Sequence, residues 1–214
     1  FKIPELRSRL IFTLFMLVLF RLGAFVPVPG VDGSALVDML GRSGGGLLGF
    51  YDMFTGGAFS RATVFALGIM PYITASIILS LLIPVIPSLE ALQKTGAEGQ
   101  RKINEYTRYG TIALCIVQSV PISIYLQSLG REVVPNPGPM FIALSVITLT
   151  TGTAFLMWIG EQISEHGIGN GISLLIFIGI VADLPNAVKN LFKMISNDQI
   201  SVMVALFMVA MMRS

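Results

Sequence analysis

The chain has 214 residues, of which 54% are hydrophobic and only 12% are charged, about half the roughly 25% of a soluble domain. So much apolar surface excludes both a soluble globular fold and a disordered chain, and leaves a polytopic α-helical membrane protein. The net charge of +2 is too small to indicate a nucleic-acid partner, and the single Cys115 excludes a disulfide framework or a multi-cysteine metal site.

Six long stretches with few or no charged residues predict membrane-spanning helices, because a span needs about 20 apolar residues. The stretches are 10–31, 62–87, 109–130, 133–160, 167–182 and 199–212. None of them alternates between polar and apolar residues, as a barrel strand would. The sequence therefore predicts an all-α membrane protein with five transmembrane helices plus a truncated sixth, as part of a longer protein.

Lysine and arginine near the ends of the spans predict the orientation of the chain in the membrane. Eight of them lie on the side of the N-terminus and of residues 88–108, and five lie on the other side. We therefore expect the N-terminus and residues 88–108 in the cytoplasm. The mixed charges of residues 88–108 indicate a solvated loop, which would also suit anionic lipid headgroups.

The segment before the second span is apolar and rich in glycine, but it is too short to cross a membrane. It runs from Gly44 to Phe59. Such a segment beside a full span is typical of a re-entrant piece, which must be buried in protein or line a cavity. An extracytoplasmic amphipathic loop fits the pattern equally well. Pro71, in the span that follows, predicts a kink because proline removes an intrahelical hydrogen bond.

Motifs for catalysis or for coupled transport are missing from the chain. Residues 162–166 lack the first histidine of an HxxEH zinc site, residues 167–172 are not GxGxxG, and no GxSxG is present. The sequence therefore predicts neither an enzyme nor a cofactor. Arg21 lies near the outer end of the first expected span, and Asp183 lies near the outer end of the fifth, which continues past residue 182. Neither has an evident partner in the sequence, which argues against a proton or sodium site.

Two pairs of isoleucines have the spacing of neighbours on one helix face. Ile69 and Ile73 lie in the second expected span, and Ile172 and Ile176 lie in the fifth. Isoleucine in a membrane helix usually contacts lipid or another helix, so the spacing alone does not indicate a pore.

From about residue 3 to residue 190, the chain resembles the SecY family, the channel subunit of the general protein translocase. The matching stretches are 54–58, 66–78 (ALGIMPYITASII), 99–103, 106–110, 155–163 and 167–173. The resemblance implies one half of an inverted-repeat channel. In this interpretation residues 1–195 are the N-terminal five-helix half, and residues 196–214 begin the C-terminal half.

The resemblance implies a passive, gated protein-conducting channel that passes unfolded secretory polypeptides across the membrane and releases signal and membrane segments sideways into lipid. The implied partners are the ribosome or the motor ATPase SecA, small membrane subunits of the SecE and SecG types, signal sequences and membrane lipid. The implied location is the bacterial plasma (inner) membrane, with a cytoplasmic N-terminus and no nucleic acid bound directly. The alternative is half of an inverted-repeat secondary transporter, which the scarcity of intramembrane carboxylates opposes.

The resemblance also assigns roles to residues. An apolar ring blocks ions because it is poorly wetted, and four of the six ring positions of the family fall on Ile69, Ile73, Ile172 and Ile176. A re-entrant plug beneath the pore falls on about residues 47–59. Its expected residues are Phe54, Gly56, Gly57 and Phe59, with the two glycines as a hinge.

A lateral gate is implied between this half and the other half of the channel. Its expected residues here are Thr74, Ile77, Ser80 and Gln118. The family usually has glutamine where this chain has Ser80, and serine is shorter and can bond back to its own helix. We therefore expect a less polar gate, which opens for weaker signals or rests slightly open.

Overall fold

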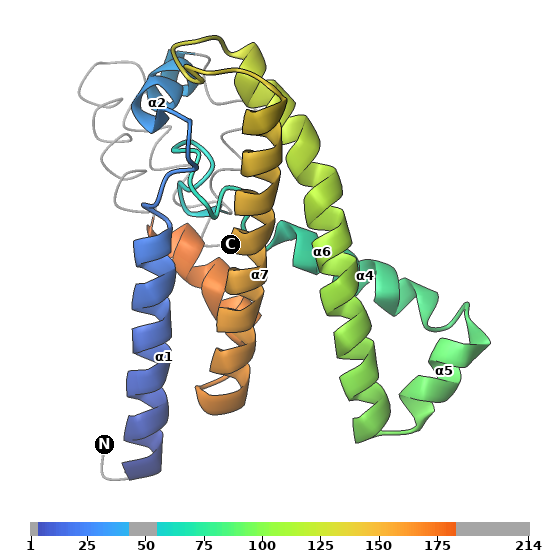
Figure 1. Ribbon diagram of the computed structural model, residues 1–214. Helices are drawn as coiled ribbons and strands as arrows, with labels where there is room; N and C mark the ends of the chain where they lie inside the picture. The colour runs from blue at the N-terminus through green and yellow to red at the C-terminus, as the bar shows by residue number, and fades with distance from the viewer. Residues whose placement is uncertain (1–3, 43–54, 183–214) are drawn as a thin grey trace, which may run out of the picture.

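The computed structural model describes residues 4–42 and 55–182 (Figure 1), and apart from one isolated bridge the regular secondary structure within these ranges is helical. The prediction of an all-α protein is confirmed for this part. The helices are α1 (Pro4–Gly23), α2 (Gly33–Arg42), α4 (Met70–Leu82), α5 (Pro87–Lys94), α6 (Ala97–Ser128), α7 (Pro139–His166) and a further helix, Gly171–Ala182.

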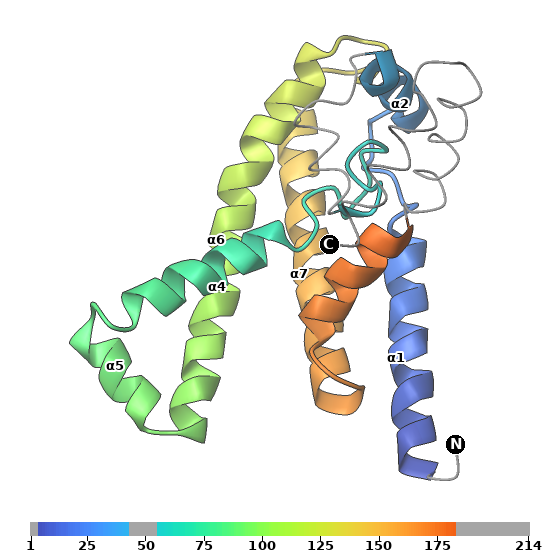
Figure 2. The same cartoon turned by 180° about the vertical axis from the view of Figure 1, so that it is seen from behind.

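Four of the helices form an upright framework. Figures 1 and 2 show α1 beside α7, with the helix Gly171–Ala182 inclined against both of them, and α6 beside α7 on its other side. Helix α4 crosses α6 and projects outward, and α5 returns the chain to the start of α6. The N-terminal end of α1 and the start of α6 therefore lie at the same end of the framework.

Within the described ranges, two helices are long and apolar enough to cross a membrane, α6 and α7, or three if α4 and α5 form one span with a 98° bend. Helix α1 has 20 residues and a length of about 30 Å, which matches a bilayer core, but Arg7, Arg9 and Arg21 keep it outside this count. The number of five spans plus a sixth stays a prediction, because the stretch 199–212 lies outside the described residues.

The second expected span differs from the structure. Residues 70–82 form α4, whereas residues 56–69 form turns that include Gly68 at φ +57° and Ala62 at φ +44°. Pro71 does not kink a helix, because it lies in the first turn of α4, but it does mark the place where the preceding short segment meets that helix, as the sequence predicted. At that position the missing N–H has no intrahelical acceptor, so proline begins the helix without cost.

The loop expected over residues 88–108 is also helical. Helix α5 begins at Pro87, and the remaining charged residues belong to the first turns of α6. The expectation of a solvated face holds, since Glu90, Lys94, Arg101 and Lys102 are partly or largely exposed. The helix of the third span therefore starts well before its apolar stretch, and the charged residues of its first turns are exposed.

Two irregular segments hold each other in place above α1 and α4. Val28 N–H donates to the Ala62 carbonyl at 2.8 Å, and Val64 N–H donates to the Val26 carbonyl at 2.9 Å. These bonds flank an isolated bridge between Pro27 and Thr63. The exit from α1 and the approach to α4 are therefore fixed to one another, which positions the first residue of the isoleucine set.

Candidate functional site

The structure brings the four predicted ring isoleucines together. Ile69 lies just before α4, is 7% exposed, and belongs to a buried apolar cluster that includes Phe20, Leu156 and Leu175; the half-buried Ile73, Ile172 and Ile176 pack against this cluster. Two segments about one hundred residues apart in the sequence thus converge on one apolar patch between α1, α7 and the helix Gly171–Ala182.

The second pair of isoleucines is held at the start of a capped helix. The Ser173 N–H donates to Oδ1 of Asn170 at 3.0 Å, which satisfies a backbone donor at the helix N-terminus. The Gly171 N–H donates to the hydroxyl of Ser164 in α7 at 2.9 Å. These bonds fix the register of Ile172 and Ile176 relative to α7.

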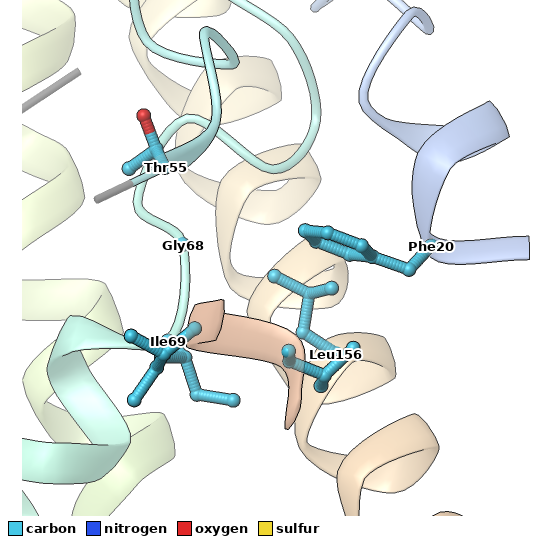
Figure 3. Close-up of a pocket in the computed structure, with 7 residues that line it drawn as sticks. Phe20, Thr55, Gly68, Ile69 and Leu156 are labelled. Atoms are coloured by element: carbon cyan, nitrogen blue, oxygen red, sulfur yellow. The ribbon is translucent and has the colours of Figure 1, made fainter. Parts of the chain in front are cut away.

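A small cavity lies between the isoleucines and the end of the predicted plug (Figure 3). Its volume of about 10 Å³ is room for about one water molecule. The lining residues are Phe20, Thr55, Gly68, Ile69, Leu156, Leu175 and Ile176. Figure 3 shows Thr55 on the opposite side from Ile69 and Leu156. The first described residue of the plug region thus lies directly over the isoleucine patch.

The predicted plug is described only from Thr55 onward, so Phe54 and residues 47–53 lie outside the described residues. Gly56 and Gly57 have φ values of +65° and +79°, a conformation that residues with a Cβ rarely adopt. An added Cβ at Gly56 would lie 3.1 Å from the Cα of Gly179. Phe59 is 5% exposed and packs in a separate cluster with Val28, Leu67 and Leu149.

The predicted gate residues lie on α4 and on α6, which contact each other. The Ser80 hydroxyl donates to the Ser76 carbonyl at 2.8 Å, which confirms that this serine bonds back to its own helix. The Thr74 hydroxyl likewise donates to the Met70 carbonyl at 3.0 Å. Ile77 is exposed and Gln118 is half-buried. The hydroxyl hydrogens of Thr74 and Ser80 are therefore used within α4.

Two contacts near the site were not evident from the sequence. Nη1 of Arg21 donates to the Gly56 carbonyl at 3.2 Å, so this arginine has a partner 35 residues away in the predicted plug. Nε of Arg108 in α6 donates to Oε1 of Glu161 in α7 at 2.6 Å. The sequence showed only that Arg21 lies inside an apolar stretch. It did not indicate which group accepts the hydrogen bond of this arginine.

A family model described as SecY matches residues 63–213. The chain is 49% identical over 206 residues to the protein translocase subunit SecY of Haemophilus influenzae, covering 96% of this chain and 47% of that protein. It is 47% identical over 216 residues to the protein translocase subunit SecY of Aquifex aeolicus, covering 99% and 50%. The chain thus spans about half the length of the curated relatives that it matches.

Solved structures of protein-conducting channels have a similar fold. One is Sec61 in the canine ribosome-channel complex, with a TM-score of 0.58 and 22% identity, covering 83% of this chain and 37% of that one. Another is a SecY protein whose plug domain stabilises the closed state of its translocation channel, with a TM-score of 0.57 and 20% identity, covering 98% and 41%. With the family match and the bacterial relatives, the conclusion is that this chain belongs to the SecY family.

Proposed function

We propose that the chain forms one half of the central subunit of a protein-conducting channel, which passes unfolded secretory polypeptides across the membrane. Residues 1–195 would be the N-terminal half and residues 196–214 the start of the second half. The observation that carries the proposal is the convergence of Ile69, Ile73, Ile172 and Ile176 on one apolar cluster. Family membership supports the same conclusion, since the relatives are translocase subunits.

An isoleucine ring suits a conduit for chains of any sequence. A fixed charge at the constriction would bind oppositely charged side chains and retain some substrates. Branched apolar side chains leave the constriction narrow and poorly wetted, so ions are excluded while no side chain is bound strongly. Such a pore needs no catalysis or cofactor of its own, and the energy for transport comes from the ribosome or from SecA.

The plug and the lateral gate complete the proposed device. The cavity that Thr55 shares with Ile69 and Ile176 supports a plug at about residues 47–59 that lies against the ring. The gate would lie along α4 and α6, with Thr74, Ile77, Ser80 and Gln118 facing a signal sequence that leaves for the lipid. Because Ser80 bonds within α4, the gate would be less polar than in relatives with glutamine there.

The orientation and the partners belong to the same proposal. The start of α1 and the junction of α5 with α6, which carry Arg7, Arg9, Arg101 and Lys102, lie at one end of the molecule (Figure 1). By the positive-inside rule, this end would face the cytoplasm. Since the relatives are bacterial translocase subunits, the chain would lie in the plasma (inner) membrane of a bacterium. Partners would be the ribosome or SecA at this end, and SecE-type and SecG-type subunits within the membrane.

Site-specific photo-cross-linking tests the proposal. The full-length protein would carry a photoreactive residue at Ile73 or Ile176, with a stalled secretory chain as bait. We expect adducts to many positions along the passing chain. A probe at Val117, whose side chain is 66% exposed on α6, is the control and should label lipid. If the probes at Ile73 and Ile176 label only lipid, the channel proposal fails and the transporter alternative is reopened.

A further inference from the structure

Arg21 connects α1 to the predicted plug. It lies in the last turn of α1, directly after the uncharged stretch 10–20, where an unpaired charge is costly. Its Nη1 donates to the Gly56 carbonyl at 3.2 Å, and this contact is partly buried. A charged donor shielded from water makes a stronger hydrogen bond than a neutral one. The bond therefore ties a rigid helix to the backbone of the plug hinge.

An aromatic ring orients the arginine. The guanidinium carbon of Arg21 lies 5.4 Å from the centroid of the Phe25 ring, and that of Arg61 lies 5.0 Å from the same centroid. Both distances are within the range of a cation–π interaction. The guanidinium of Arg21 therefore contacts the Phe25 ring while it donates to the Gly56 carbonyl.

The backbone of Gly56 is held from a second side as well. Its φ of +65° fixes the direction of the peptide groups on either side, and an added Cβ would make a tight contact of 3.1 Å with the Cα of Gly179. The neighbouring Thr55 lines the cavity that Ile69 and Ile176 also line. A bond to the Gly56 carbonyl is thus made one residue from the point where the plug meets the isoleucine patch.

We propose that Arg21 is a positioning residue that holds the plug hinge in the closed channel. The inference rests on the proposed function, and it adds a residue of α1 to the gating machinery. We call the hydrogen bond between Arg21 and Gly56 the latch. When the plug leaves the pore, the guanidinium loses the Gly56 carbonyl but keeps its contact with the ring of Phe25, so the latch can form again. One charged hydrogen bond favours the closed state without making it permanent.

The test is the resting ion conductance of the full-length protein, assembled with its partner subunits in a planar lipid bilayer without substrate. Arg21→Met keeps the length of the side chain but removes the donor and the charge. We expect its resting conductance to rise about tenfold, the effect of losing one charged hydrogen bond. Arg21→Lys retains a charged donor and should restore part of the seal. Arg131→Met, in the exposed loop after α6, is the matched control and should stay at the wild-type value.

A second measurement separates the latch from the channel. Transport of a secretory precursor into vesicles by the wild-type protein tests the channel, and its absence would overturn the proposed function. If transport is normal and Arg21→Met is as tight as the wild type, the latch is wrong and the channel stands. An Arg21→Lys variant that leaks as much as Arg21→Met would also contradict the latch. If Arg21→Met does not assemble, Arg21→Gln replaces it, because its shorter, uncharged side chain also removes the charged donor. A resting conductance of Arg21→Gln at the wild-type value would then reject the latch.

Discussion

Asp32 begins α2 on the side of the molecule opposite the N-terminus. Its Oδ1 accepts hydrogen bonds from the N–H groups of Ser34 at 2.9 Å and Ala35 at 3.3 Å, and from the Ser34 hydroxyl. These bonds favour the ionised carboxylate, so the Ser34 hydroxyl, followed by the two backbone donors, lowers the pKa of Asp32 below its ordinary value of 3.8. The residue acts as the N-cap of a short helix.

The cap makes the start of α2 sensitive to acid. Because the pKa is lowered on folding, the stabilisation is present above the ordinary value of 3.8 and is lost as the pH falls through the lower pKa of the folded state. Hydrogen exchange of the Ser34 and Ala35 amides measures this stabilisation. We expect the protection of both amides to fall only when the pH drops below the ordinary Asp pKa of 3.8. Asp32→Asn, which caps without a charge, should remove this pH dependence. Asp32→Ala should lose protection at every pH, and equal protection in all three proteins would contradict the cap.

The sequence predicted the contacts of some individual residues but not of others. The isoleucine pairs were visible from their spacing, but their role came from the family resemblance, and the structure shows that both pairs belong to or pack against one apolar cluster. The partner of Arg21 could not be predicted, because a backbone carbonyl carries no signature in the sequence. That Ser80 bonds back to its own helix was predictable, since a serine hydroxyl reaches the carbonyl four residues before it.

Among the elements, α7 approaches the irregular segment before α4 very closely at Gly152. A Cβ added to Gly152 would meet the backbone carbonyl of Val64 and lie 2.7 Å from its Cγ1. A backbone carbonyl cannot move aside as a flexible side chain can. Small residues at helix contacts commonly permit such close approach in membrane proteins. The contact holds the irregular segment before α4, which includes Ile69, against α7.

We predict that Gly152→Ala destabilises the protein. The added methyl group should cost about 1–3 kcal/mol through overpacking, despite the higher helix propensity of alanine. Thermal unfolding of the purified full-length complex in detergent measures the effect. Gly110→Ala in α6 is the matched control, because its Cβ would make an ordinary contact of 3.7 Å with that of Ala75. Equal melting temperatures for the two variants would contradict the close approach.

The boundaries of the elements were the least predictable part of the fold. A stretch without charges predicts where apolar residues lie, but it does not say where a helix begins. In residues 62–87 the turns before α4 depend on backbone conformations at Ala62 and Gly68 that composition does not encode. In α6 the helix is longer than its apolar stretch. It begins at Ala97, and the charged residues between there and residue 109, whose composition is typical of a loop, are part of it. The type of element was predictable because membrane spans admit few alternatives.

On the scale of the whole molecule, the candidate seal depends on two distant segments meeting. Ile69 and Ile73 come from the start of α4, and Ile172 and Ile176 from the helix after α7. The bonds between residues 26–28 and 62–64 place the first pair, and the Asn170 cap and the Ser164 hydroxyl place the second. Since each pair has its own supports, a change within the patch can be tested without displacing either segment.

Ile73→Asp tests the seal directly. A carboxylate at this position would retain water in the constriction, so the apolar barrier to ions would fall. We expect the resting conductance of the full-length channel to rise at least about tenfold, which requires a barrier lower by only about 1.4 kcal/mol. Ile78→Asp is the matched control, because it places the same charge on the same helix at a more exposed residue. If both variants conduct alike, or if Ile73→Asp conducts no more than the wild type, the isoleucine patch is a packing contact and not the seal of a pore.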